Sequence, residues 1–338
     1  MLIFGSGFRR VMKQPQSRTL LLAMAVLTAG LGCSPVSSLQ PTPLPPTPAT
    51  PTPPPSPPPL SPPPRGQETS YPHLPLQSDE LAALLMQLEQ QLRSSTPEDS
   101  EVPALAHQQQ VLYRRLGRDA PLAAAVRAQL LPRWRTVFDH HLGARRALLA
   151  MGPRGSKPRT LPPWRIISPA PAATLLASYK QAEAATGIPW QVLAAVNLVE
   201  TGMGRIDGVS VAGATGPMQF LPSTWAERGI GKGNIRNPHD AIQAAARYLV
   251  RRGGLQDIRR GLWGYNNSPY YGKAVLHYAA LLRDDPGAFT GLYHWQIHLL
   301  TTAGDVWLPE GTNNTSRIPV EQHLRRYPNS VAPTPAGN

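Results

Sequence analysis

Apolar residues recur every three or four positions through much of the chain beyond residue 74, which is the period of an α-helix with one buried face. The first such series is a run of leucines at Leu81, Leu84, Leu85, Leu88 and Leu92. A second series covers residues 107–116, after an acidic, proline-containing break. A third opens at Asp119 and Pro121, a pairing typical of a helix N-cap and first turn. We expect Pro132 to kink or split this third helix.

A second group of helices is predicted beyond another break, which covers residues 153–163. The helical segments are 172–186, 189–201, 222–228, 238–252, 258–265 and 269–283. Gly187 and Gly202 mark C-terminal helix ends, because glycine readily adopts the left-handed conformation that closes a helix. Asn237 stands in the N-cap position of its helix.

The C-terminal part shows a different period. Residues 293–299 alternate between apolar and polar side chains, which is typical of a strand. A turn at residues 303–304 could return the chain as a second strand over 305–308. The remaining residues, rich in Pro, Asn and Arg, are expected to be loose. The pattern therefore predicts an all-α fold with a possible short β-hairpin near the C-terminus.

The first 33 residues have the pattern of an export signal. A basic stretch precedes a 13-residue apolar run over 19–31, and Cys33 follows that run. This is typical of a secretory signal, and the run is too short to span a bilayer comfortably. The segment resembles a bacterial lipoprotein signal, in which Cys33 becomes the lipidated N-terminus, although Leu31 stands one position later than that pattern has its leucine. A cleaved signal with an incidental cysteine and an uncleaved anchor are the alternatives.

Composition separates a spacer from the folded part of the chain. The sequence has 40 prolines, and 16 of them fall between Pro35 and Pro64. Proline fixes φ and removes a hydrogen-bond donor, so we expect residues 34–73 to be a disordered linker of polyproline II character that extends about 3.1 Å per residue. The single cysteine excludes disulfide-stapled and cysteine-zinc architectures.

Basic residues outnumber acidic ones 33 to 20, and residues 107–165 carry 12 Lys or Arg against 2 Asp or Glu. This excess indicates an anionic partner such as nucleic acid, a membrane surface or a cell-wall polymer. The export signal and the lack of a helix-turn-helix signature argue against nucleic acid. Attraction to an anionic envelope surface and a merely solvated basic face remain two interpretations. His294 and His298 have metal-ligand spacing, but no Glu follows the first, and we expect no metal site.

Glu200 is the strongest candidate for chemistry. It lies four residues after Val196 and seven after Leu193, which places a carboxyl group on an apolar face at the last turn of its helix. Burial and the helix dipole both disfavour the ionised form. A carboxylic acid that stays protonated near neutral pH is what general acid catalysis of glycoside cleavage needs. The alternative is a helix-end glutamate that turns outward or caps a neighbouring amide.

Three motifs in order make residues 170–282 resemble the catalytic domain of the lytic transglycosylases, in the soluble-transglycosylase and goose-type branch of the lysozyme-like fold. The first is VETGMG, with Glu200 in the family's catalytic position. The second, GATGPMQFLPSTW, matches the family pattern G-x-x-G-x-M-Q-x-x-P-x-T. The third contains Tyr265 and Asn266, which fit the family's Tyr-Asn pair.

The resemblance implies a set of substrate-binding residues around Glu200. They are Ser210, Gly216, Met218, Gln219, Phe220, Tyr265 and Asn266. Gln219 could hydrogen-bond an N-acetyl or hydroxyl group, and the hydroxyl of Tyr265 could orient the Glu200 carboxyl. Met218 and Phe220 could equally be core residues, and Tyr265 a buried tyrosine whose hydroxyl is satisfied elsewhere.

The implied organisation is a signal over 1–33, a linker over 34–73, a helical basic module over 74–163, a catalytic domain over 164–284 and an extension over 285–338. The implied reaction cleaves the MurNAc-GlcNAc β-1,4 bond of peptidoglycan and leaves a 1,6-anhydro end. In it Glu200 acts first as acid and then as base, with no cofactor or metal. Neither Asp207 nor Asp240 has family support as a second carboxylate, and Asp240 fits a first-turn helix acid better.

The expected partners are peptidoglycan glycan strands and, through Cys33, a membrane. The expected location is the outer face of the cytoplasmic membrane or the periplasm. A goose-type muramidase, which uses water in place of the sugar hydroxyl, and a non-catalytic peptidoglycan-binding lipoprotein are the alternatives.

Overall fold

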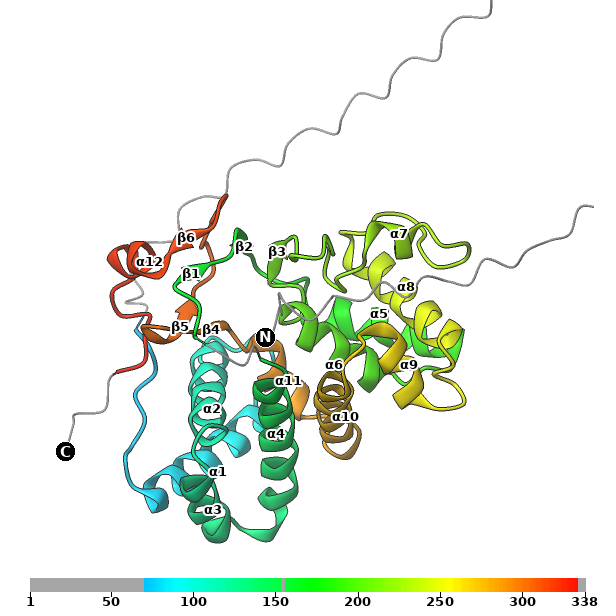
Figure 1. The fold of residues 1–338 in the computed structure, drawn as a ribbon. Coiled ribbons are helices and arrows are strands. Elements are labelled where there is room, and N and C mark those ends of the chain that lie inside the picture. Colours follow the sequence, from blue (N-terminus) through cyan, green and yellow to red (C-terminus); the bar gives the residue numbers. More distant parts are fainter. Residues whose placement is uncertain (1–69, 153–155, 334–338) are drawn as a thin grey trace, which may run out of the picture. The chain divides into compact units, whose positions relative to one another are not determined.

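The computed structural model describes residues 70–152 and 156–333. The expected signal, Cys33 and most of the expected linker lie outside these residues. Within the described part the chain is mostly helical (Figure 1), as the sequence predicts. No helix in these two ranges is long and apolar enough to cross a membrane.

Four helices form the N-terminal part. They are α1 (Ser78–Ser94), α2 (Val102–Leu116), α3 (Ala120–Gln129) and α4 (Pro132–Met151). The Asp119 side chain accepts a hydrogen bond from the amide of Leu122, so it caps α3 as predicted. Pro132 splits the third predicted helix into two, because a proline is tolerated at the start of a helix but not in its interior.

The next seven helices follow the predicted pattern closely, with one addition. They are α5 (Ala172–Thr186), α6 (Trp190–Thr201), α7 (Pro222–Trp225), α8 (Pro238–Arg251), α9 (Ile258–Tyr265), α10 (Pro269–Asp284) and α11 (Ala288–His294). Gly187 and Gly202 close α5 and α6 in the left-handed conformation, with φ of 78° and 61°. Helix α6 is almost wholly buried, and it packs against α5 and α10.

Three small antiparallel sheets complete the fold. The pairs are β1 (Thr160–Leu161) with β6 (Ile318–Pro319), β2 (Trp164–Ile166) with β3 (Ile206–Gly208), and β4 (Ile297–Thr301) with β5 (Gly304–Leu308). The last pair is the predicted hairpin. Side chains of these strands form a separate apolar cluster, which includes Leu161, Trp164, Ile206, Ile297 and Leu308.

Two predictions about the C-terminal part are wrong. Tyr293 and His294 lie in helix α11 rather than in a strand, and the strand begins only at Ile297. The tail is not loose either, because it contains β6 and the helix α12 (Val320–Arg326). In both places the structure depends on distant partners: α11 is buried against α1 and α2, and β6 pairs with β1. A local pattern carries no signal for such contacts.

The N-terminal helices pack directly against residues of the C-terminal part and share a core with them. One apolar core runs from α1 to α11, and α4 lies alongside α10 (Figure 1). Ion pairs join the same parts, because Arg93 contacts Asp285 (2.5 Å) and Arg114 contacts Asp305. Part of the basic excess of residues 107–165 is therefore internal, while side chains such as Arg133 and Arg146 remain exposed.

Candidate active site

Glu200 lies in the last turn of α6, one residue before the helix ends. The eight residues from Val192 to Val199 are all buried, and Glu200 itself is half-buried. Burial raises the pKa of Glu200 to about 7, against a usual value of 4.5, and the nearby Tyr271 hydroxyl opposes this with a smaller lowering effect. Near neutral pH the carboxyl group is therefore present in both its protonated and its ionised form, and the shift has the direction that burial in the predicted helix implies.

The C-terminal end of α6 is tied to the glycine-rich loop of the second motif. The side chains of Asn197 and Thr201 both donate hydrogen bonds to the carbonyl oxygen of Pro217, at 2.8 Å and 2.6 Å. The Thr201 oxygen also accepts from the amide of Gly204 (3.0 Å). These bonds fix the loop relative to the turn that carries Glu200. Sequence reasoning missed both residues, although their spacing of four within an otherwise apolar helix is the signal that could have found them.

The loop itself has the backbone strain that often marks a functional site. Gly216 has φ of 76°, and a Cβ atom there would collide with the carbonyl oxygen of Ile235, so only glycine fits. Gln219 has φ of 49°, in the left-handed region that a non-glycine residue rarely adopts. Its Nε2 donates to the carbonyl oxygen of Gly216 (3.0 Å). Its Oε1 is buried and has no hydrogen-bond partner in the described part of the chain.

The structure assigns different positions to the other predicted loop residues. Met218 and Phe220 are 0% and 3% exposed, which places both side chains in the core. Ser210 follows β3, and its hydroxyl oxygen accepts hydrogen bonds from the amides of Ala212 (3.3 Å) and Ala214 (3.0 Å). The Ser210 hydroxyl hydrogen remains available for donation to a ligand. Of these three residues, Ser210 is the one whose side chain is half-exposed.

Two tyrosines lie near Glu200, and they have different tasks. Tyr265, at the end of α9, donates its hydroxyl to the carbonyl oxygen of Met218 (2.7 Å), so it supports the loop rather than orienting the carboxyl group. Tyr271, on α10, has its hydroxyl beside Glu200, and burial together with that carboxylate raises the pKa of Tyr271 well above its usual value. No described atom makes a well-aligned hydrogen bond to the Tyr271 hydroxyl. Asn266 is half-buried and ends α9.

Sequence reasoning expected Tyr265 near Glu200, with its hydroxyl either orienting the carboxyl group or satisfied elsewhere, and it missed Tyr271. Both belong to the same motif, six residues apart. Their rings lie nearly parallel, with centroids 6.3 Å apart. The motif shows that tyrosines meet at this place, but only the three-dimensional packing shows which hydroxyl reaches the carboxyl group.

The other candidate carboxylates are engaged elsewhere. Asp207 forms ion pairs with Arg165 and with Arg236 (2.8 Å). Asp240 lies in the first turn of α8, as predicted, and accepts from the amide of Asn234 (2.8 Å). Within residues 70–152 and 156–333, no second carboxylate is close enough to Glu200 to shift its pKa. Both of the other candidate carboxylates are therefore bonded to groups other than Glu200.

The pair His294 and His298 is separated by the fold. His294 contacts the carbonyl oxygen of Pro97 (2.7 Å), while the Nε2 atoms of His298 and His107 are 2.9 Å apart. The structure, over the residues it describes, shows no group of three or more potential metal ligands.

The site thus has a helix-end carboxyl group with a raised pKa, on a turn that is hydrogen-bonded to a glycine-rich loop. Residues 177–274 match the family described as the transglycosylase SLT domain. The chain therefore contains this domain, and the domain implies peptidoglycan-degrading activity. The match covers less than a third of the chain and includes Glu200, Ser210 and the tyrosine motif. Searches of curated proteins and of solved structures found no match.

Proposed function

We propose that the protein is a murein lytic transglycosylase that cleaves the MurNAc-GlcNAc β-1,4 bond and leaves a 1,6-anhydro-MurNAc end. One observation carries this proposal: Glu200 has a pKa of about 7, and no carboxylate among the described residues contributes to that shift. Retaining glycosidases need a second carboxylate about 5 Å from the acid, and inverting ones need it about 6.5–9.5 Å away. A reaction that uses one carboxyl group twice requires neither.

The proposed reaction has two proton transfers through the same group. Protonated Glu200 first donates its proton to the glycosidic oxygen as the bond from that oxygen to C1 of MurNAc breaks. The resulting carboxylate then accepts the proton of the C6 hydroxyl of the same sugar while the C6 oxygen attacks C1. Glu200 ends the cycle protonated. A pKa near 7 suits both steps, and the intramolecular attack replaces water because its effective molarity is high.

The neighbouring side chains support these steps. The Tyr271 hydroxyl can donate a hydrogen bond to the carboxylate after the first proton transfer, which agrees with its lowering effect on the Glu200 pKa. The Oε1 of Gln219 is buried and has no partner in the described part of the chain, so it can accept a hydrogen bond from the N–H of an acetamido group or from a sugar hydroxyl once the side chain turns toward the substrate. Ser210, in the loop that follows β3, can donate its hydroxyl hydrogen to the substrate.

The two rival functions make different predictions for the products. A muramidase of the same fold would give reducing ends, and a binding protein would give no products. Purified peptidoglycan is incubated with the protein, and the muropeptides are treated with borohydride and separated by mass. We expect ends that resist reduction and that are lighter by one water molecule than hydrolysed ends. Reducible ends would establish a muramidase, and intact sacculi would establish a binding protein.

We also propose that the protein is exported and held by a lipid on Cys33, with peptidoglycan glycan strands as its partner and no role for nucleic acid. The basic N-terminal stretch, the apolar run and the position of the only cysteine support the anchor. The proline-rich segment supports a site that works away from the membrane, since 30 such residues reach roughly 90 Å when extended. The outer face of the cytoplasmic membrane and the periplasm both fit this arrangement.

A further inference from the structure

A cavity lies where the N-terminal helices meet the helix that carries Glu200. Its wall is formed by Gln110, Tyr113, Arg114, Arg145, Leu148, Leu198, Val199, Gly202, Tyr278, Trp295 and Gln296. These residues include two arginines and no carboxylate. The cavity has a volume of about 30 Å³, and about 10–15 Å³ is enough to hold one particle of the size of a water molecule. It therefore holds one or two particles of that size.

Arg145 is the unusual member of this wall. The residue is only 6% exposed, its Nε atom is buried without a hydrogen-bond partner in the described part of the chain, and none of the ion pairs found there involves Arg145. Its side chain packs closely against Gly117: a Cβ atom added at Gly117 would lie only 2.6 Å from the Cγ atom of Arg145. This packing fixes the position of the Arg145 side chain. Burial lowers the pKa of Arg145 to about 9, so the group still carries its charge at neutral pH. A buried charge without a partner is strongly destabilising.

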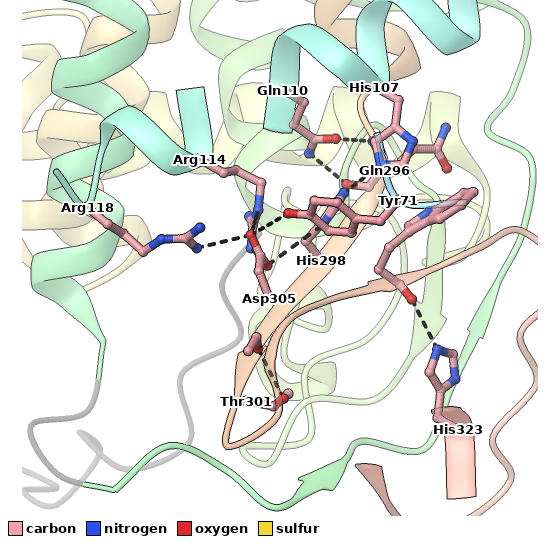
Figure 2. A network of polar contacts seen from close by, with 12 residues as sticks. Tyr71, His107, Gln110, Arg114, Arg118, Gln296, His298, Thr301, Asp305 and His323 are labelled. Atoms are coloured by element: carbon pink, nitrogen blue, oxygen red, sulfur yellow. Dashed lines mark hydrogen bonds and ion pairs between the residues drawn. The ribbon is translucent and has the colours of Figure 1, made fainter. Parts of the chain in front are cut away.

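The carboxylate of Asp305 is not available to pair with Arg145, because it already accepts hydrogen bonds from other groups. Asp305 accepts from Arg114 (2.7 Å to Nε), from Arg118 (3.1 Å) and from the hydroxyl of Tyr71 (3.1 Å), as Figure 2 shows. Two arginines and a tyrosine therefore occupy this carboxylate, and Arg145 is left without an acidic partner among the described residues. The parts of the sequence that the structure does not describe add a single acidic side chain, Glu68. The cluster has an excess of positive charge beside a cavity of the size of a small ion.

We propose that this cavity binds a small monovalent inorganic anion of chloride size, held by the guanidinium of Arg145 beside Arg114 and the Tyr278 hydroxyl. The negative charge of the proposed ligand follows from the two arginines in the cavity wall and from the lack of a carboxylate among the lining residues. The size follows from the cavity volume, which leaves no room for a sugar or a peptide. The bound anion neutralises Arg145 and so stabilises the packing of α4 against α10.

The cavity also borders the proposed catalytic turn. Leu198 and Val199 precede Glu200 directly and form part of its wall, together with Gly202, which closes α6. The anion is therefore a structural link between the N-terminal helices and this turn. Its binding can be measured without any assay of activity, so the inference stands or falls separately from the proposed reaction.

The test uses the full chain and follows thermal unfolding as sodium gluconate is replaced by sodium chloride or bromide at constant ionic strength. We expect a saturable rise in Tm of about 3 °C when chloride reaches about ten times its dissociation constant. Arg145→Met keeps an apolar stem and removes the charge, so its Tm should not respond to the exchange. Arg146→Met, which changes the exposed neighbouring arginine on the same helix, should respond like the parent.

A second measurement keeps the inference testable if Arg145→Met does not fold. Crystals of the parent soaked in bromide should show an anomalous scattering peak between the side chains of Arg145 and Tyr278. An empty cavity, or a parent Tm that depends only on ionic strength, would overturn the proposal. So would a chloride response that appears only in Glu68→Gln, because that result would assign the site to this chain's own carboxylate.

Discussion

The carboxyl group of Glu200 lies beside the hydroxyl group of Tyr271, across the contact between α6 and α10. The hydroxyl favours the ionised carboxyl, whereas burial favours the protonated one and has the larger effect. The balance leaves the pKa of Glu200 at about 7, which is where a group that must both give and take a proton works best.

Tyr271→Phe should shift the pH profile of activity. Removing the hydroxyl removes the effect that lowers the Glu200 pKa, so the alkaline limb of the kcat profile should move to higher pH. The rate at neutral pH should fall by roughly tenfold, because the carboxylate loses a hydrogen-bond donor. Tyr270→Phe, at the half-buried neighbouring position, is the control and should leave the profile in place. An unchanged alkaline limb in Tyr271→Phe would remove this tyrosine from the site.

Glu200→Gln should stabilise the fold while it strongly lowers activity. A carboxyl with a pKa of about 7 in the folded state and 4.5 when unfolded binds more protons when folded, so folding stability falls as pH rises through this range. The glutamine variant avoids that loss, and we expect a gain of about 1–3 kcal/mol in the free energy of unfolding at pH 8 and almost none at pH 4.

The matched control for this experiment is Glu80→Gln, which changes an exposed glutamate on α1. It should show no such pH-dependent gain in urea denaturation. Activity of Glu200→Gln should fall by about 10²–10⁴-fold, while its sedimentation with peptidoglycan survives. Digestion at the parent rate would show that another residue supplies the proton.

Thr201→Val should loosen the hydrogen-bonded link between the turn that carries Glu200 and the glycine-rich loop. The variant keeps the shape of the side chain but loses the hydrogen bonds to Pro217 and Gly204. We expect kcat to fall by roughly tenfold or more with a small change in KM, because misplaced catalytic groups affect the reaction step more than binding. In Thr186→Val, whose hydroxyl also bonds a backbone carbonyl but lies on α5, kcat should stay at the parent value. Equal losses in both variants would indicate a general effect on folding.

Cys33→Ala tests the expected anchor. Without the only cysteine no lipid can be attached there, so the protein should move from the membrane fraction to the soluble fraction of cell extracts. Ser37→Ala, four residues further on, should stay with the membrane. A Cys33→Ala protein that remains membrane-bound with its N-terminus intact would instead indicate an uncleaved anchor.

Local sequence signals were sufficient for most helices and for the position of Glu200. Asp119 and Gly187 act on their own neighbours, so the start of α3 and the end of α5 follow from a few residues. The pairing of Trp164 with Gly208 and the contact of Arg114 with Asp305 join residues far apart in the chain. Such contacts depend on the packed fold, and no periodicity or motif reports them.

The central claim is that the sugar's own hydroxyl, and not water, attacks C1. The direct measurement is digestion of purified peptidoglycan in water enriched with heavy oxygen, followed by mass analysis of the MurNAc ends. An intramolecular attack takes no oxygen from the solvent, so we expect anhydro ends without the heavy isotope. MurNAc ends that carry one heavy oxygen atom at C1 would show that water is the nucleophile, and would contradict the proposed reaction.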